Sequence, residues 1–228
     1  MPKRKKKYIL GEIRVLIEFL FCFLKVLFSR SEKNQGKKPT VMVITGLGTG
    51  DGYTFLLRWF LKKKGCLSYK GESGFNQGNT EVILPRLEKK LKQIYNLEGK
   101  VTLLGWSLGG VYSLSLYSKH PEKIKKIITL GSPLKIKPGS NIDWVYPLIS
   151  GKNIKELTEE INKNTKNIPS DTPLTSIYSK TDGVVPAEFC FSKNLTNINY
   201  YQVGGSHLGL PFNFQAFKIS QNQISKTQ

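Results

Sequence analysis

One serine of this sequence stands in a context that suits a nucleophile. Ser107 lies at the centre of Gly105-Trp106-Ser107-Leu108-Gly109, between a short apolar run and a segment with helical spacing. A tight turn from strand to helix exposes a serine side chain, and flanking glycines remove the Cβ atoms that would clash there. The N–H groups at the start of the helix would also lie beside a developing oxyanion. The pattern therefore predicts nucleophilic chemistry at Ser107.

A serine nucleophile needs a base, and the chain contains two histidines. His120 precedes Pro121 at the end of a predicted helix, and it is most simply explained as a surface residue. His207 follows the last predicted strand, within the glycine-rich segment 204–209. Catalytic bases belong on loops at the C-terminal edge of a parallel sheet, so His207 is the predicted base.

The base in turn needs a carboxylate that fixes its tautomer. Asp182 lies just beyond a predicted strand, 25 residues before His207. Turn chemistry alone could explain its Asp-Gly sequence, and Asp143 and Asp171 are alternatives. Neither alternative directly follows a predicted strand. We therefore expect Ser107, Asp182 and His207 to form a catalytic triad.

Two backbone N–H groups should form an oxyanion hole. One belongs to the residue after the nucleophile, Leu108, and the other to the loop after the first central strand. The sequence Gly46-Leu47-Gly48 occupies that loop, which makes Leu47 the second candidate. A phosphate-binding loop is the alternative, but position 51 is Asp where the dinucleotide pattern has Gly. His, Cys, Asp and Glu show no metal-ligand spacing, so we expect neither cofactor nor metal.

The rest of the pattern indicates the elements that would position these residues. From Pro39 onward, short apolar runs alternate with helical spacings, which is typical of βαβ units and a mainly parallel sheet. We expect an α/β fold with about six strands and helices on both faces. The predicted strands are 41–45, 66–70, 101–104, 127–130, 174–178 and 199–203, and the predicted helices are 55–64, a segment around 84–95, and 109–119.

A long segment, 132–173, separates two of these strands. Connections of this length are uncommon in compact domains and are often functional. The segment is rich in apolar residues, and the spacing of Ile154, Leu157 and Ile161 predicts one short helix within it. We expect a lid-like insertion or a wall of an acyl pocket. The residues expected to contact substrate are Trp106, Trp144, Tyr146 and Leu208.

The charge of the chain is strongly positive. There are 35 Lys and Arg residues against 16 Asp and Glu, a formal net charge of +19, which first suggests a nucleic-acid partner. However, 11 basic residues lie in the first 38 positions, and the others are scattered over predicted helix faces. No zinc finger, aromatic RNP pattern or basic helix with heptads accompanies them. We therefore expect no nucleic-acid partner.

The N-terminal segment, residues 1–38, joins a basic run at 3–7 to an apolar stretch at 8–28. Four charges interrupt the stretch and no small-residue cleavage site follows, which argues against a spanning helix and a signal peptide. On a helical wheel Glu12 lies opposite a polar side formed by Arg14, Glu18, Cys22, Lys25 and Ser29. The wide apolar face leaves two interpretations open, an interfacial membrane anchor and a helix packed on the domain.

Localisation and domain limits follow from the same observations. Three widely spaced cysteines, an odd number, argue against a disulfide framework and favour a reducing compartment. We expect a cytoplasmic protein held at the inner face of an anionic membrane through residues 1–30, at roughly 1 kcal/mol per basic residue. The predicted domain spans 39–220, and a tail at 221–228 follows it.

Five blocks follow one another along the chain: Val43-Ile44-Thr45-Gly46-Leu47-Gly48, Gly105-Trp106-Ser107-Leu108-Gly109-Gly110, Ile128-Thr129-Leu130-Gly131-Ser132-Pro133, Ile177-Tyr178-Ser179-Lys180-Thr181-Asp182-Gly183-Val184-Val185-Pro186 and Gly205-Ser206-His207. In this order they resemble the α/β-hydrolase superfamily, in particular its small bacterial lipase and esterase branch. The order of serine, aspartate and histidine is also that of the superfamily. The resemblance covers about residues 39–215 and implies the same roles for the triad and oxyanion residues.

Two departures accompany this resemblance. Many relatives carry histidine before the oxyanion glycine, whereas this chain has Thr45, so the orientation of the loop would rely on a hydroxyl. The first two strands of larger relatives are missing, which implies a reduced sheet.

The sequence thus predicts a serine carboxylic ester hydrolase that forms an acyl-enzyme intermediate. The apolar insertion and the N-terminal helix favour a lipid-like acyl ester as substrate. An acyltransferase with the same triad is one alternative, because a bound alcohol could replace water. A non-catalytic membrane-surface module on a hydrolase fold is another, although the complete triad argues against it.

Overall fold

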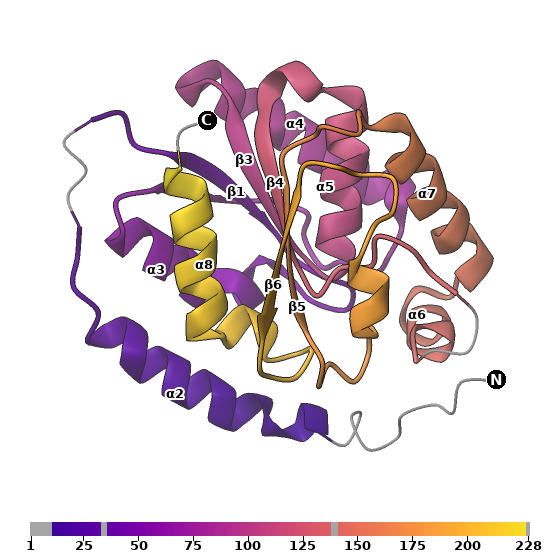
Figure 1. The fold of residues 1–228 in the computed structure, drawn as a ribbon, viewed down its shortest axis with the longest axis horizontal. Coiled ribbons are helices and arrows are strands. Elements are labelled where there is room, and N and C mark those ends of the chain that lie inside the picture. The colour runs from indigo at the N-terminus through magenta and orange to yellow at the C-terminus, as the bar shows by residue number, and fades with distance from the viewer. Residues whose placement is uncertain (1–10, 33–35, 138–140, 227–228) are drawn as a thin grey trace.

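The computed structural model describes residues 11–32, 36–137 and 141–226, and its centre is a parallel β-sheet (Figure 1). Six strands are hydrogen-bonded in the order β2-β1-β3-β4-β5-β6, and every neighbouring pair runs parallel. The predicted fold class is therefore confirmed. The strands are β1 Thr40–Ile44, β2 Leu67–Lys70, β3 Val101–Trp106, β4 Ile124–Leu130, β5 Leu174–Ser179 and β6 Ile198–Val203.

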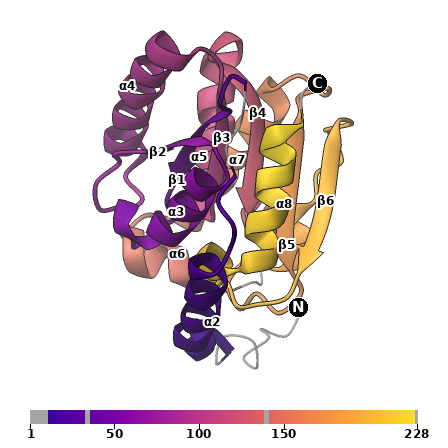
Figure 2. The ribbon, with the colours of Figure 1, turned by 90° about the vertical axis from the view of Figure 1, so that its left-hand side faces the viewer.

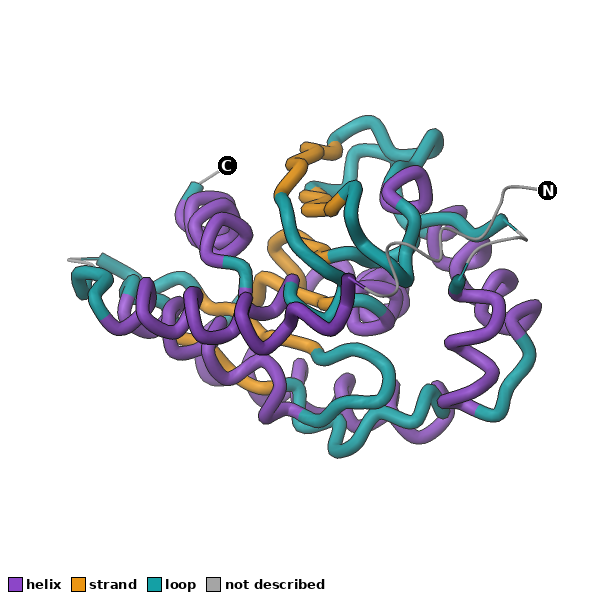
Figure 3. Tube along the Cα trace, turned by 90° about the horizontal axis from the view of Figure 1, so that it is seen from below, coloured by secondary structure: helices purple, strands orange, loops and turns teal. Residues whose placement is uncertain are grey.

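Helices lie on both faces of this sheet (Figures 2 and 3). They are α2 Val15–Leu27, α3 Phe55–Lys63, α4 Thr80–Glu98, α5 Leu108–Lys119, α6 Ile142–Ser150, α7 Ile154–Asn167 and α8 Phe214–Ser225. Buried side chains of α4, α5, α6 and α7 form one apolar cluster with the sheet. Those of α2, α3 and α8 form a second cluster.

Strand β1 shows how the sheet serves both clusters. Val41 and Val43 pack with α3 and α8, whereas Met42 and Ile44 pack with α4 and α5. Successive side chains of a strand point to opposite faces, and here both faces are covered by helices. This explains why the sequence shows an unbroken apolar run at 41–44 instead of an alternation.

The described part of the insertion at 132–173 contains two helices, where the sequence predicted one. Helix α7 follows the predicted spacing, and its Leu157 and Ile161 are buried. The additional helix is α6, which carries Pro147 in its interior and exposes Leu148 at its surface. A proline lacks a backbone donor, and apolar residues on both sides of a nine-residue helix hide its periodicity.

Helix α8 was not predicted, and it includes residues 221–225 of the expected tail. The side chain of Asn213 caps its N-terminus by accepting a hydrogen bond from a backbone N–H of the first turn. Ser220 and Gln223 lie on its buried side among apolar residues. These polar residues on the buried side weaken the apolar periodicity that would identify the helix.

The N-terminal segment packs on the domain as a 3₁₀ turn, η1 Gly11–Arg14, continued by α2. Cys22 and Val26 are buried against the domain, and the rings of Phe19 and Phe212 are perpendicular with their centroids 5.1 Å apart. Of the two interpretations of this segment, the structure shows the helix that packs on the domain. Residues 1–10, with the basic run at 3–7, lie outside the described residues.

The side of α2 that packs on the domain carries apolar and acidic residues together. Phe19, Phe23 and Val26 join the second apolar cluster, and the carboxylates of Glu12 and Glu18 accept hydrogen bonds from backbone N–H groups of the domain. The wheel placed Glu12 opposite Glu18. In the structure Glu12 belongs to the 3₁₀ turn and not to α2, and both carboxylates contact the loop after β6. Among the described residues, no helix is long and apolar enough to span a bilayer. The exposed large apolar residues of the N-terminal segment, which form the outer side of η1 and α2 and the residue after α2, are Ile13, Leu16, Ile17, Leu20, Phe21, Leu24, Leu27 and Phe28.

Candidate active site

Ser107 connects β3 to α5 in a backbone conformation that L residues rarely adopt. Its φ is 53° and its ψ is −123°. A Cβ on Gly105 would lie 2.3 Å from the carbonyl oxygen of Gly109, and a Cβ on Gly109 would lie 2.3 Å from that of Ile44. The two glycines therefore permit a close approach of backbone segments. The surrounding backbone in turn fixes Ser107 in its strained conformation.

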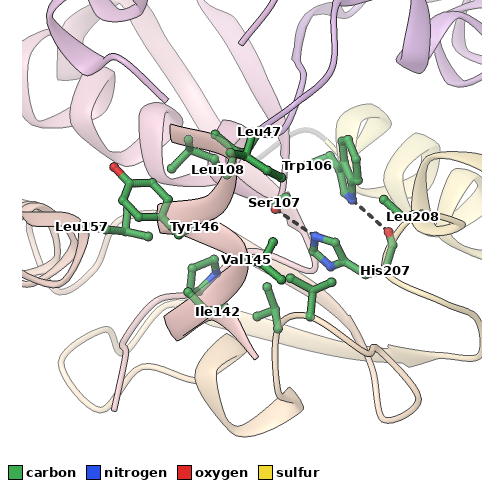
Figure 4. A pocket seen from close by; sticks show the side chains of 14 residues that line it. Leu47, Trp106, Ser107, Leu108, Ile142, Val145, Tyr146, Leu157, His207 and Leu208 are labelled. Atoms are coloured by element: carbon green, nitrogen blue, oxygen red, sulfur yellow. Dashed lines mark hydrogen bonds between the residues drawn. The ribbon is translucent and has the colours of Figure 1, made fainter. Parts of the chain in front are cut away.

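Ser107, His207 and Asp182 form a hydrogen-bonded line. The Oγ atom of Ser107 lies 2.9 Å from Nε2 of His207 (Figure 4), and Nδ1 of His207 lies 2.7 Å from Oδ2 of Asp182. Because the carboxylate accepts, Nδ1 carries the proton of the neutral imidazole. Nε2 is then the acceptor that faces the serine hydroxyl. The structure thus brings together the three residues that the sequence singled out.

The second carboxylate oxygen of Asp182 is held by its own loop. Oδ1 accepts hydrogen bonds from the N–H groups of Val184 and Val185, at 2.8 and 2.7 Å. The turn chemistry considered as an alternative is therefore present together with the contact to His207. The other candidates lie elsewhere: His120 at the end of α5, 3.0 Å from Glu88, and Asp171 in the turn before β5.

The surroundings of His207 act on its pKa in opposite directions. Burial of the side chain lowers the pKa, because the charged imidazolium is poorly solvated there. The charge of Asp182, its hydrogen bond to the ring, and the charge of Glu12 raise the pKa. The raising effects prevail, so the pKa of His207 lies above its ordinary value. The site therefore stabilises the imidazolium that a proton transfer from serine would form.

Two aromatic side chains support the loop of His207. Trp106 Nε1 donates to the carbonyl oxygen of His207 at 3.1 Å, as Figure 4 also shows. The hydroxyl of Tyr53 donates to the carbonyl oxygen of Leu208 at 2.9 Å, and its ring stacks on that of Trp106 with centroids 4.9 Å apart. Trp106, predicted as a substrate contact, thus also holds the histidine loop. Tyr53 was missed, because nothing in its sequence context links it to position 208.

The predicted oxyanion loop lies directly against the serine. A Cβ on Gly46 would lie 2.9 Å from Cβ of Ser107, and Leu47 and Leu108 both line the pocket at Ser107. The hydroxyl of Thr45 meets that of Thr49 at 2.6 Å, and Thr49 donates to the carbonyl oxygen of Gly46 at 2.9 Å. The hydroxyl groups of Thr45 and Thr49 therefore hold the oxyanion loop, as expected from threonine at position 45, where many relatives carry histidine.

Asn76 is a further support of this loop that the sequence did not reveal. Its backbone N–H donates to Thr49 at 2.9 Å, its carbonyl oxygen accepts from Gly48 at 2.7 Å, and its side chain donates to Thr45 at 3.3 Å. The residue is fully buried. It comes from an irregular segment after β2, where no spacing marks it.

A pocket of about 90 Å³ opens beside Ser107, and apolar side chains form most of its wall (Figure 4). Of the predicted substrate contacts, Trp106, Tyr146 and Leu208 line it. Trp144 does not line it and is 39% exposed on the outer side of α6. The insertion contributes Ile142, Val145, Tyr146, Ile149 and Leu157 to the wall.

The chemistry of these groups is that of nucleophilic attack on a carbonyl carbon. A serine hydroxyl faces an imidazole acceptor, a carboxylate orients that imidazole, and a helix begins beside the serine. Among the described residues, no group of three or more His, Cys, Asp or Glu side chains could hold a metal ion.

Among curated proteins, the chain is 24% identical over 149 residues to the pimeloyl-[acyl-carrier protein] methyl ester esterase of Pseudoalteromonas atlantica, which covers 64% of this chain and 58% of that protein. It is 42% identical over 66 residues to the biotin biosynthesis bifunctional protein BioHC of Teredinibacter turnerae, covering 28% of this chain and 12% of that protein. The chain thus spans less than two thirds of the length of either relative.

The solved structure of a mature lipase from Bacillus licheniformis superposes with a TM-score of 0.62, at 17% identity, over 87% of this chain and 96% of that chain. At this identity the likeness concerns the fold. A protein family described by the alpha/beta hydrolase fold matches residues 68–224, which is more than half of the sequence. The parallel sheet, the serine turn and this match agree: the chain belongs to the α/β-hydrolase family.

Proposed function

We propose that the protein is a serine carboxylic ester hydrolase with Ser107 as its nucleophile. The observation that carries the proposal is the line from Ser107 through His207 to Asp182, with contacts of 2.9 and 2.7 Å at the wall of an apolar pocket. The similarity to a methyl ester esterase and, in fold, to a lipase supports ester substrates.

In the proposed first half-reaction, His207 Nε2 takes the proton of the Ser107 hydroxyl while Oγ attacks the ester carbonyl carbon. The carbonyl oxygen becomes an oxyanion, which the N–H groups of Leu47 and Leu108 stabilise. Asp182 stabilises the imidazolium. The C–O bond to the alcohol then breaks, the alcohol leaves with the proton from His207, and the acyl group stays on Ser107.

The second half-reaction returns the enzyme to its first state. His207 takes a proton from water while the water oxygen attacks the acyl carbon. The bond between the acyl carbon and Ser107 Oγ breaks, and the serine recovers its proton from His207. The carboxylic acid leaves.

The apolar wall of the pocket supports an acyl substrate with a hydrocarbon chain. Burial of each CH₂ group contributes about 0.8 kcal/mol, so a chain that enters this pocket binds more tightly than an acetyl group. The residues of α6 that line the pocket form the side along which a longer chain would extend.

Labelling with a fluorophosphonate tests the nucleophile. The native protein and Ser118→Ala, a change on the same helix, should be labelled, and Ser107→Ala should not. Folded native protein that takes up no label would refute the proposed activity. Hydrolysis of acetyl, butyryl and octanoyl nitrophenyl esters tests the substrate class, and a preference for the acetyl ester would remove the lipid-like substrate.

We further propose that the enzyme works on the surface of an anionic membrane, through the exposed apolar side of α2. Leu16 is 76% and Phe21 61% exposed on this side, in a helix that packs on the domain with its other side. Lipid is the occupant favoured by charge, because the net charge is +19 and the basic run 3–7 adjoins the segment in sequence. Helix α6 also exposes apolar residues, and Figure 1 places α2 and α6 along the same edge of the molecule.

Sedimentation with phosphatidylcholine vesicles, with and without phosphatidylserine, tests this location. The native protein should bind the anionic vesicles, and the double variant Leu16→Ser, Phe21→Ser should lose most of this binding. Leu97→Ser is the matched control, because Leu97 is 75% exposed at the other end of the domain, on α4. Unchanged binding of the double variant would contradict the proposal. A dimer that this variant abolishes, without vesicle binding by the native protein, would assign the surface to a second copy.

A further inference from the structure

The carboxylate of Glu12 lies among backbone N–H groups of two loops at the active site. Its Oε1 atom accepts hydrogen bonds from Gly183 and His207, both at 2.8 Å, and its Oε2 atom accepts from Leu208 at 2.8 Å. The side chain is buried, with 7% of the residue exposed. A buried carboxylate needs such donors, because an unpaired charge in this environment is strongly unfavourable.

The N–H groups that bind Glu12 belong to the two loops that carry Asp182 and His207. Gly183 directly follows Asp182 in the loop after β5, and His207 lies in the loop after β6. One side chain from the N-terminal segment therefore bonds the backbone beside the orienting carboxylate and the backbone of the base itself. A displacement of either loop would change the 2.7 Å contact between Asp182 and His207.

Glu18 and Arg14 add a second set of contacts between the N-terminal segment and the loops after β5 and β6. Glu18 accepts a hydrogen bond from the N–H of Ser206 at 2.9 Å, and another from the Ser206 hydroxyl. Arg14 lies 3.4 Å from Glu18 and donates to the hydroxyl of Thr181 at 3.1 Å. The N-terminal segment thus contacts both loops through more than one side chain.

The loop after β6 is shaped to receive Glu18. A Cβ on Gly209 would lie 1.7 Å from Oε2 of Glu18, and a Cβ on Gly205 would lie 3.3 Å from its Oε1. Glycine at 209 therefore leaves the space that the carboxylate fills. The fit between the space beside Gly209 and the carboxylate of Glu18 is a second observation, besides the hydrogen bonds, that places α2 against this loop.

We propose that Glu12 is a positioning residue for the His207–Asp182 pair, and that the N-terminal segment from Gly11 to Leu27 is a part of the active site. Glu12 fixes the distance between the two loops and places a negative charge near the imidazole. It touches no substrate. The inference rests on the proposed function for its effect on turnover, whereas its effect on His207 can be measured in the absence of any reaction.

Glu12→Gln is the variant that tests the role. The amide oxygen can still accept, but the amide NH₂ would face a backbone N–H, so one of the three hydrogen bonds is lost together with the charge. We expect kcat to fall by roughly 10- to 100-fold with little change in KM, because a displacement of about 1 Å at the base has that effect. Glu81→Gln, on the exposed first turn of α4, is the control for charge alone.

The pKa of His207, followed by NMR titration of its ring protons, separates positioning from general stability. Loss of the Glu12 charge should lower this pKa, and the acid limb of kcat/KM should move to lower pH. Unchanged pKa and kcat in folded Glu12→Gln would overturn the proposal. The titratable and charged groups around His207 and its loop are Asp182, Glu12, Glu18, Arg14, Tyr53 and the Cys190 thiol beside Asp182.

Two further measurements keep the test decisive. If Glu12→Gln does not fold, Glu18→Gln replaces it, since the side chain of Glu18 is 20% exposed and its loss disturbs the packing less. A native kcat in folded Glu18→Gln would then overturn the role of the segment. Protein that takes up no fluorophosphonate, yet shows the lowered pKa, would refute the esterase and retain the positioning by Glu12.

Discussion

Gly105→Ala should damage the nucleophile turn in a predictable way. The added Cβ would lie 2.3 Å from the carbonyl oxygen of Gly109, whereas ordinary contact begins at 3.4 Å, so the two backbone segments must separate by roughly 1 Å. Both belong to regular elements, β3 and α5, that are buried on all sides. Ser107 lies between them, and a misplacement of about 1 Å lowers catalytic rates by about 100-fold. Such overpacking also lowers the free energy of unfolding, by about 1–3 kcal/mol.

The rate of fluorophosphonate labelling is the suitable assay, because it reports the serine and its base without any contribution from product release. Gly52→Ala is the control, since a Cβ on Gly52 meets nothing within 4 Å. Thermal unfolding of both variants gives the change in stability. A Gly105→Ala protein with the native labelling rate and the native melting temperature would refute the argument from backbone proximity.

Three further predictions concern the surroundings of the serine. Asp182→Asn should lower kcat by about 10⁴-fold, since an amide leaves His207 in the wrong tautomer, and retained turnover in a steady-state assay would contradict this. The pKa of His207 is raised and only the neutral ring accepts a proton, so kcat/KM should decline as pH falls through a midpoint above the ordinary value of about 6.5, and a pH–rate profile measures it. Asn76→Ala should lower the free energy of unfolding in urea by about 1–3 kcal/mol, because it removes the buried side-chain hydrogen bond to Thr45; an unchanged midpoint would exclude that role.

The strands and the serine, aspartate and histidine could be predicted because their signals are local. The four inner strands β1, β3, β4 and β5 are almost entirely buried, and a strand buried on both faces needs little else to be identified. The edge strands β2 and β6 are partly exposed, and their β-branched and aromatic residues marked them. Ser107, Asp182 and His207 each follow a predicted strand, and the C-terminal ends of parallel strands meet at one edge of the sheet. Their proximity is therefore a consequence of topology.

The contacts of the N-terminal segment could not be predicted, because their signals are not local. Glu12 bonds Gly183 and His207, which lie 171 and 195 positions away in the chain. The helical wheel identified a wide apolar face and left membrane binding and packing on the domain open. In the structure part of this face packs on the domain, and backbone N–H groups of two loops bind the carboxylates of Glu12 and Glu18. A wheel cannot represent such donors, because it contains only the side chains of one helix.

The space at Gly209 has an evolutionary consequence. Any other residue at this position would place a Cβ 1.7 Å from the carboxylate of Glu18, so the Glu18 side chain would have to leave this position and its hydrogen bond with Ser206. Among homologous chains, an acidic residue at the position of Glu18 should accompany glycine at the position of Gly209. Where a homologue carries a larger residue at the position of Gly209, the acidic residue at the position of Glu18 should be absent. Covariation of these two positions would then mark the relatives whose N-terminal helix contacts the histidine loop.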